Sequence, residues 1–334
     1  MTENKSMNKR VYGVIGIKSI MANWNADFTG YPRTTSDCEV FASDKALKYP
    51  MKQMWKADKN NKLLYVKTFM ADFKPMGIDT KFKNEFNIEL MDCENSKKAK
   101  KKDTENKSKE EQQDLEKYKQ EIVKNLFSCI DVKQFGCTFA PATKGNNLSI
   151  TGAVQIAQGF NKYEETCPQV MKISSPFPTE EGDASSTLGT KIVSNEAHYA
   201  YHFAINPDAY ADFVEMGVTE GYTEEDYAKF KEAALTSATS FNTNSKVGCE
   251  NELAVFVETD KNTYLPDLSQ YVYFKKADDE SEKDTIELKF DKILNDVKDK
   301  IQSVEIYYNP YTTTIVADIE NAKMMNIFTQ DEVE

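Results

Sequence analysis

The chain has 334 residues, 40% of them hydrophobic and 29% charged, so it can bury a sizeable core and its length suggests about two domains. No apolar run approaches the roughly 18 residues of a membrane-spanning helix, and MTENKSMNKR does not begin a typical secretory signal, so we expect a cytoplasmic protein without membrane association. The net charge of −12 argues against a generic basic nucleic-acid binder, and six scattered cysteines without a CxxC pair favour reduced thiols.

The first part of the chain predicts a strand, a loop and a helix. Val11–Ile20 is a short, β-branched apolar run that is typical of a buried strand. The polar stretch 21–37 contains a Gly-Tyr-Pro turn signal and predicts a loop. Ser43 or Asp44 can then cap an amphipathic helix, which Pro50 either kinks or ends.

The rest of the chain predicts short strands interleaved with a few helices, an α+β pattern with an antiparallel sheet. A low-complexity charged segment, 94–121, interrupts this pattern and leads into an amphipathic helix. The long stretch 159–189 is irregular, and such a loop is either functional or disordered. The other expected elements are strands at Lys62–Phe69, Ile130–Phe139, Leu148–Gln158, Lys191–Asn206 and Val247–Val257, helices at Thr223–Ser237 and Leu288–Ile301, and a terminal hairpin of Glu305–Tyr308 with Thr312–Asp318.

The sequence contains few of the patterns that carry catalysis. His198 and His202 have a spacing that chelates a metal on a helix, but AHYAYHF alternates like a strand and favours packing or surface histidines. Asp27 and Asp37 lie in the loop before a basic helix, where they serve either metal-assisted RNA cleavage or, as we favour, turns and caps. We therefore predict no catalytic residue, no metal and no cofactor.

The positive charge of the chain is concentrated near its N-terminus. Residues 1–83 hold 15 Lys or Arg against 8 Asp or Glu, a balance of +7, whereas the remaining 251 residues hold 27 against 46, a balance of −19. Forty of the 42 basic residues are lysines, and Arg33 is one of only two arginines. This asymmetry predicts a local basic surface on an acidic body.

A stripe of lysines follows the predicted helix that Ser43 begins. Lys45, Lys48 and Lys52 recur at a spacing of three or four residues, so they share one helix face. Arg33 and the hydroxyl of Ser43 precede this stripe, and a helix N-terminus attracts phosphate. Together these groups form a rim that grips phosphates without reading bases. The alternative is that the lysines only keep an acidic assembly protein soluble.

The residues of several blocks resemble one known family. Arg10–Trp55 (RVYGVIGIKSIMANW…KQMW) resembles the N-terminal region of the Cas7 family, the CRISPR-associated backbone subunits of type I Cascade complexes, and most of all its type I-B branch. Further blocks agree in the same order, at Asp131–Ala140, Ser149–Gln158, Leu188–Pro207 and Thr239–Leu253. The likeness covers most of the chain except the charged insertion.

The resemblance implies an α+β fold shaped like a hand. An RRM-like (ferredoxin-like) palm is expected from residues 1–92, 128–162 and 187–334, with C-terminal elaborations. The charged segment 93–127 is expected as a helical finger insertion. The irregular stretch 163–186 falls where the family has a long β-hairpin thumb.

The resemblance also implies a function. Copies of the protein stack head-to-tail into a helical filament along a CRISPR RNA, with other Cascade subunits, and leave the guide bases free to pair with target DNA in antiviral defence. Such a protein is not an enzyme. Related type III subunits have the same fold and cleave target RNA with an acidic loop residue, so a ribonuclease using Asp37 is the alternative.

The resemblance assigns RNA-binding roles to individual positions. Lys48, after a Ser-rich helix start, is the first candidate for a phosphate contact, and Ser43 lies in that start. Lys45 and Lys52 belong to the same stripe, whereas Lys18 and Arg33 match positions near the guide groove. The remaining assignments are Met171 and Leu188 as apolar wedges against bases, and Gly152 as a point where the palm strand approaches RNA or another strand closely.

Overall fold

The computed structural model describes residues 6–93, 107–178, 186–279 and 281–333. Sheets and helices are mixed in the chain, which divides into two compact units that we describe separately. The chain crosses between the units several times, and some crossings fall inside a helix or strand, as in α1 (Asp44–Ala57) and α7 (Glu224–Thr236). The first unit comprises Met1–Lys9, Lys52–Gln155 and Ile205–Lys231, and the second comprises Arg10–Met51, Ile156–Ala204 and Glu232–Glu334.

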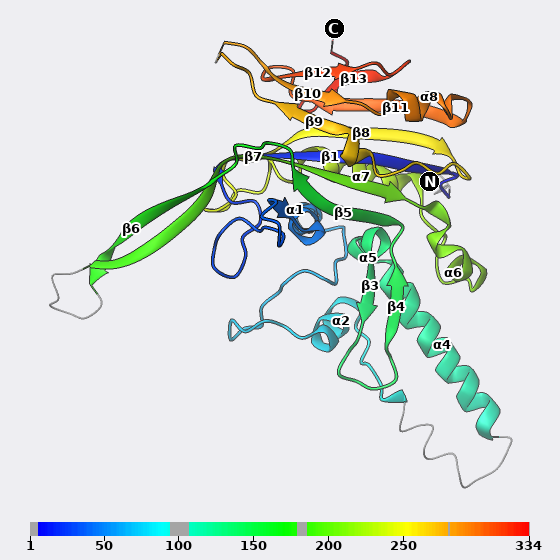
Figure 1. The fold of residues 1–334 in the computed structure, drawn as a ribbon. Helices are drawn as coiled ribbons and strands as arrows, with labels where there is room; N and C mark the ends of the chain where they lie inside the picture. Colours follow the sequence, from blue (N-terminus) through cyan, green and yellow to red (C-terminus); the bar gives the residue numbers. More distant parts are fainter. Residues whose placement is uncertain (1–5, 94–106, 179–185, 280, 334) are drawn as a thin grey trace. The chain divides into compact units, whose positions relative to one another are not determined.

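The second unit is built on a large, mainly antiparallel sheet (Figure 1). Within the described residues it has eight strands, in the order β13-β11-β8-β1-β7-β5-β2, with β6 paired to β7. The long central strand β1 has a continuous buried run at Val11–Ser19, as expected from its β-branched residues. The strands are β1 (Lys9–Ala22), β2 (Phe41–Ala42), β5 (Val154–Asn161), β6 (Pro168–Pro178), β7 (Ser186–Ile205), β8 (Cys249–Asp260), β11 (Ile301–Tyr308) and β13 (Lys323–Asn326).

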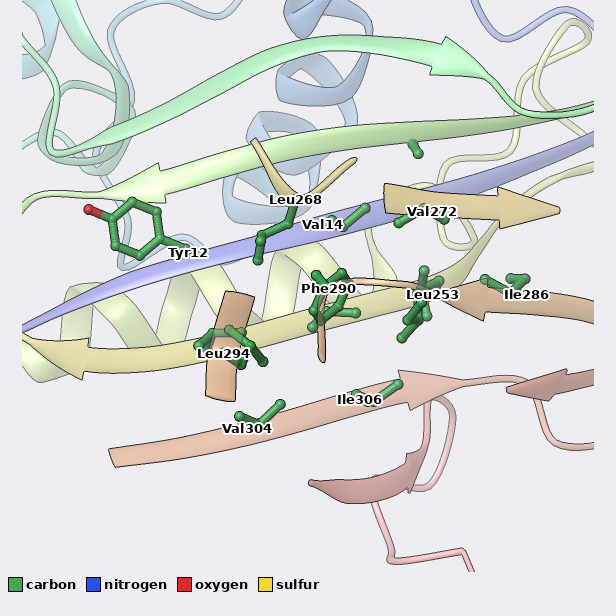
Figure 2. Close-up of a cluster of buried hydrophobic side chains, with 14 residues drawn as sticks. Tyr12, Val14, Leu253, Leu268, Val272, Ile286, Phe290, Leu294, Val304 and Ile306 are labelled. Carbon is green, nitrogen blue, oxygen red and sulfur yellow. The ribbon is translucent and has the colours of Figure 1, made fainter. Parts of the chain in front are cut away.

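A smaller sheet packs over one face of the large sheet within the second unit. Its strands are β9 (Val272–Lys275), β10 (Asp284–Leu288) and β12 (Thr313–Ala317), in the order β12-β10-β9. Figure 2 shows the core between the layers, where Val14 of β1 and Leu253 of β8 lie near Phe290 and Ile286. Short turns complete this layer, namely η3 (Leu268–Tyr271), α8 (Asp291–Asn295) and η4 (Lys298–Lys300).

Helices are the main regular elements of the first unit. A two-stranded ribbon, β3 (Gly136–Phe139) with β4 (Leu148–Thr151), accompanies its helices. The helices are α2 (Ile78–Phe86), α4 (Lys107–Phe127), α5 (Ile130–Phe135), the turn η2 (Pro207–Tyr210) and α6 (Ala211–Glu215). Two further helices, α1 (Asp44–Ala57) and α7 (Glu224–Thr236), continue from one unit into the other.

Several local predictions are confirmed. The helix predicted after Ser43 is α1, and it runs through Pro50 without ending. The predicted start of α7 is a capping box, in which Thr223 Oγ1 accepts a hydrogen bond from Asp226 N at 3.2 Å and Asp226 Oδ2 accepts one from Thr223 N at 2.9 Å. By contrast, the stretch 159–189, expected to be irregular, contains strands among its described residues, where β6 pairs with β7 in a register that runs from Pro168 opposite Ser194 to Ser174 opposite Leu188 (Figure 1).

Four predictions are wrong, and for two of them, Lys62–Phe69 and the terminal hairpin, distant partners decide the local structure. Lys62–Phe69 is not a strand, and Ile130–Phe139 begins as helix α5 before it becomes β3. The helix expected at Leu288–Ile301 is reduced to α8 and η4. The expected terminal hairpin is absent from the described residues, because β11 pairs with β8 and β13, whereas β12 pairs with β10.

A buried histidine links three strands of the second unit. His198 of β7 places Nδ1 2.8 Å from Glu252 of β8 and Nε2 3.1 Å from Glu196, and its ring stacks on Phe274 of β9. Lys276 Nζ also lies 2.7 Å from a carboxylate oxygen of Glu196. Burial lowers the pKa of His198, but the two carboxylates outweigh it and raise the pKa above its usual value.

We expect this cluster to make the second unit less stable as pH rises. Because the folded-state pKa of His198 is raised, its contribution is full below the unfolded pKa of about 6.5 and is lost as pH passes through the folded pKa. H198Q removes the cation beside the buried carboxylate of Glu252, whereas Glu196 keeps Lys276, so it should cost about 3 kcal/mol at pH 6. The difference from wild type should shrink towards pH 9 in urea unfolding of the full chain. A difference that is constant with pH would contradict this account.

Candidate functional site

A single asparagine joins the loop after β1 to the start of α1. The backbone oxygen of Asn25 accepts a hydrogen bond from Arg33 N at 3.0 Å, and its Oδ1 accepts one from Ser43 N at 2.8 Å. The loop also pairs with the edge of the large sheet, because Phe41 N donates to Arg33 O at 3.0 Å. Arg33 and Ser43, which the sequence places ten residues apart, are therefore brought to one place.

A half-buried lysine, Lys246, holds the beginning of this loop. Lys246 Nζ donates to the backbone oxygens of Asn23, at 2.8 Å, and of Trp24, and lies 5.1 Å from the centre of the Trp24 indole ring. Burial lowers the pKa of Lys246. Trp24 Nε1 in turn donates to the hydroxyl of Tyr201 on β7 at 2.7 Å. Sequence reasoning missed Asn25 and Lys246. Asn25 accepts hydrogen bonds from backbone N–H groups and Lys246 donates to backbone oxygens, and no sequence motif indicates such contacts.

The start of α1 is capped and charged. Ser43 Oγ accepts a hydrogen bond from Ala46 N at 3.3 Å, which makes Ser43 the N-cap. Asp44 follows it and lies 2.8 Å from Lys45 Nζ and 3.0 Å from Lys48 Nζ. Burial raises the pKa of Asp44, but the two lysines outweigh it and hold the pKa below its usual value. A carboxylate thus competes with any phosphate for these two lysines.

The three lysines of the predicted stripe differ in exposure and in their partners. The side chain of Lys45 is 83% exposed, whereas that of Lys48 is 16% exposed and held by Asp44. Lys52, in the first unit, lies 3.9 Å from the buried carboxylate of Asp131 and 5.8 Å from the centre of the Tyr65 ring. Lys52 therefore has a structural role, and Lys45 is the most accessible of the three.

Arg33 offers the clearest unused donor of the site. Its Nε is buried, and within the part of the chain that the structure describes no acceptor lies within hydrogen-bond distance of it. A buried donor without a partner costs free energy of about 1–3 kcal/mol. Guanidinium groups bind phosphate oxygens well, so an anion at this position would satisfy Arg33.

Lys18 is not brought to this site. It is 9% exposed on β1, and strand alternation places it on the face of Tyr12 and Val14, which carries the smaller sheet. Tyr201, which holds Trp24, follows core residue Ala200 on β7 and so lies on the opposite face. The contact assigned to Lys18 stays a prediction without support from neighbouring groups.

The other assigned positions lie elsewhere. Gly152 is buried in the first unit, where a Cβ atom would lie 2.1 Å from the carbonyl carbon of Phe135. Packing against protein backbone therefore explains this glycine. Met171 is half-buried on β6 opposite Lys191, and the backbone of Leu188 on β7 lies opposite Ser174.

No metal centre stands out in the described residues. Within them no three His, Cys, Asp or Glu side chains are grouped to hold an ion. Because His198 and His202 lie on a strand, their backbones are about 13 Å apart, and they have different partners. Asp37 is exposed in the loop, whereas Asp27 caps a turn.

Among the helices of the described residues, none is both long and apolar enough to cross a membrane.

A large groove of the second unit is a weaker candidate for binding phosphates. It has a volume of about 1000 Å³ and lies between residues 38–40, 161–166 and 272–278. Its lining carries four carboxylates against three lysines, so its charge does not favour an anion. The loop at Arg33 and the start of α1 therefore form the candidate site.

Comparison with known proteins identifies the family. The family profile for the CRISPR-associated protein Cas7 matches residues 9–293. The chain belongs to the Cas7 family. The fold of this Cas7 protein is similar to that of a solved chain described as "CRISPR RNA-guided surveillance complex, pre-nicking", with a TM-score of 0.54 and 13% identity over 95% of this chain and 97% of that one.

A second solved chain, "CRISPR RNA-guided surveillance complex", has a TM-score of 0.47 and 12% identity over 92% of this chain and 94% of that one. No curated protein matches the chain at a significant level. Family membership confirms the resemblance at the level of Cas7.

We expect G152A to destabilise the first unit of this Cas7 protein rather than to act on a ligand. The added methyl group meets backbone atoms, which cannot move away cheaply, so the cost should be about 1–3 kcal/mol or more. G77A is the control, because a Cβ atom on Gly77 meets nothing within 4 Å and should cost less than about 1 kcal/mol. Thermal unfolding measures both. Unchanged stability with lost RNA affinity would instead support an RNA contact at Gly152.

Proposed function

We propose that the protein is a CRISPR RNA-binding backbone subunit of a type I Cascade complex, most like the type I-B branch. Membership of the Cas7 family supports the role. The solved chain with a TM-score of 0.54 comes from a complex described as an RNA-guided surveillance complex. The protein holds the guide by its backbone, and base pairing reads the target DNA.

One observation carries the proposal for the RNA-binding surface. Arg33 has a buried Nε without an acceptor in the described residues, and it is fixed through Asn25 beside the Ser43 cap of α1. A capped helix start provides unpaired N–H groups and a partial positive charge. Arg33, Ser43 and Lys45 can therefore bind successive phosphates or 2′-hydroxyls of one RNA strand.

The wider architecture of the proposal follows the family. The large sheet forms the RRM-like palm, the insertion before Phe127 belongs to the finger, and the β6–β7 hairpin is the thumb. Exposed apolar residues on the hairpin, Val170 at 52% and Ile173 at 47%, support a surface that contacts a partner. Copies stack head-to-tail along the guide, with Met171 and Leu188 as base wedges, and other Cascade subunits complete the assembly.

The two arginines of the chain provide a matched test. R33Q and R10Q remove the same charge, but Arg10 already donates to Lys261 O at 2.7 Å. We expect R33Q to weaken CRISPR RNA binding about tenfold or more, because it removes a charge-assisted hydrogen bond. The slope of log affinity against log salt should fall by about 0.7 per copy. R10Q should change neither quantity, and equal effects of the two variants would contradict the site.

The carboxylate of Asp44 gives a prediction in the opposite direction. D44N removes the negative charge that lies 2.8 Å from Lys45 and 3.0 Å from Lys48, and leaves a polar side chain of the same shape. Both lysines then become available to phosphates, so RNA affinity and the salt slope should both rise, by about 0.7 in the slope per added contact. Weaker binding by D44N in the same titration would show that the lysines do not face the RNA.

We further propose that the protein is not an enzyme and does not cut the RNA it helps to target. The alternative, a type III-like ribonuclease, would use Asp37, which is exposed in the same loop as Arg33. Complex assembled with a guide is mixed with complementary RNA and magnesium, and cleavage is followed on a gel for wild type and D37A. We expect intact RNA with both. Cleavage by wild type that D37A abolishes would establish the ribonuclease instead.

A further inference from the structure

A fully exposed phenylalanine stands at the tip of the loop after β1. Phe28 has no contact that reduces its accessibility, and Tyr31 beside it is 41% exposed. The loop forms a short antiparallel ribbon here, because Ala26 bridges Pro32 and Asp27 N donates to Tyr31 O at 2.8 Å. Phe28 and Thr29 lie at the turn of this ribbon.

The turn that presents Phe28 is rigidly built. Asp27 Oδ1 accepts hydrogen bonds from Thr29 N at 2.8 Å, from Thr29 Oγ1 at 2.7 Å and from Tyr31 N at 3.0 Å. Gly30 has a φ of +90°, which only glycine adopts readily, and Asn23 Nδ2 donates to its oxygen at 3.0 Å. The backbone that presents the exposed ring is therefore fixed, so binding has to order only the Phe28 side chain itself.

The same ribbon carries Arg33. Arg33 is paired with Asn25, and Asn25 precedes Phe28 by three residues. The Cα atoms of Arg33 and Phe28 are therefore about 10 Å apart along the ribbon. An exposed aromatic ring beside a cation with an unused donor is the combination with which proteins bind single-stranded nucleic acid, because bases stack on rings while cations hold the backbone. Charge complementarity therefore favours RNA over an apolar protein segment.

We propose that Phe28 is a stacking platform for an unpaired base of the RNA strand whose phosphates bind at Arg33 and the start of α1. This rests on the proposed function and extends it, because it adds a base contact that is independent of sequence to a site made of backbone contacts. It also assigns a role to the loop itself, separate from the β6–β7 hairpin.

The chain offers a spectroscopic test with a matched control. Phe73 is also strongly exposed, at 86%, but it lies on a turn of the first unit that carries no arginine. The native Trp24 and Trp55 are buried and give a constant background. On addition of a CRISPR RNA we expect the fluorescence of F28W to be quenched by the stacked base, and that of F73W to stay unchanged.

Affinity measurements on the full chain complete the test. F28A should weaken RNA binding about tenfold while the salt slope keeps the wild-type value, because the ring carries no charge. Wild-type affinity of F28A together with an unquenched F28W overturns the stacking platform but leaves the proposed function intact. Reduced self-association of F28A in sedimentation, with RNA affinity unchanged, assigns Phe28 to a second copy instead. If the wild-type protein itself binds no RNA, both proposals fall.

Discussion

The hydrogen bonds of Asn25 are the interaction on which the candidate site depends. Through its backbone oxygen and its side chain, this residue ties Arg33 to Ser43 and so sets the loop against the start of α1. Lys246 fixes the beginning of the same loop by binding the oxygens of Asn23 and Trp24. Such fixed positions favour phosphate binding, because the conformational entropy of ordering the cations is lost during folding rather than during binding.

The electrostatics of the protein follow from where its charges lie rather than from their sum. The net charge is −12, yet residues 1–83 carry a balance of +7. At the start of α1 the local balance depends on Asp44, which neutralises two lysines until an anion competes with it. Arg33 has no such carboxylate at its Nε in the described residues. An acidic body with a few fixed cations suits an RNA-binding protein that must avoid indiscriminate binding.

The sequence predicted the features whose causes are local. Ser43 caps α1 and Thr223 begins α7, because each bonds to residues three positions away. Features with distant causes escaped prediction. Lys62–Phe69 is not a strand because Asp131, 66 and 67 residues away, accepts its N–H groups at Leu64 and Tyr65. For the proposed site, the sequence indicates the cations and the helix cap, whereas the contact of Lys52 with Asp131 and the exposure of Phe28 depend on tertiary structure.

The central claim is that this Cas7 protein holds a guide RNA through the loop and the start of α1. The most direct measurement is to purify the wild-type protein and a double variant, R33Q with K45Q, from cells that carry a CRISPR array and to sequence the RNA that copurifies. We expect wild type to carry small RNAs of equal length that contain CRISPR repeat sequence, and the double variant to lose most of them. Wild-type protein that carries no RNA, or equal amounts of random fragments in both proteins, would contradict the account.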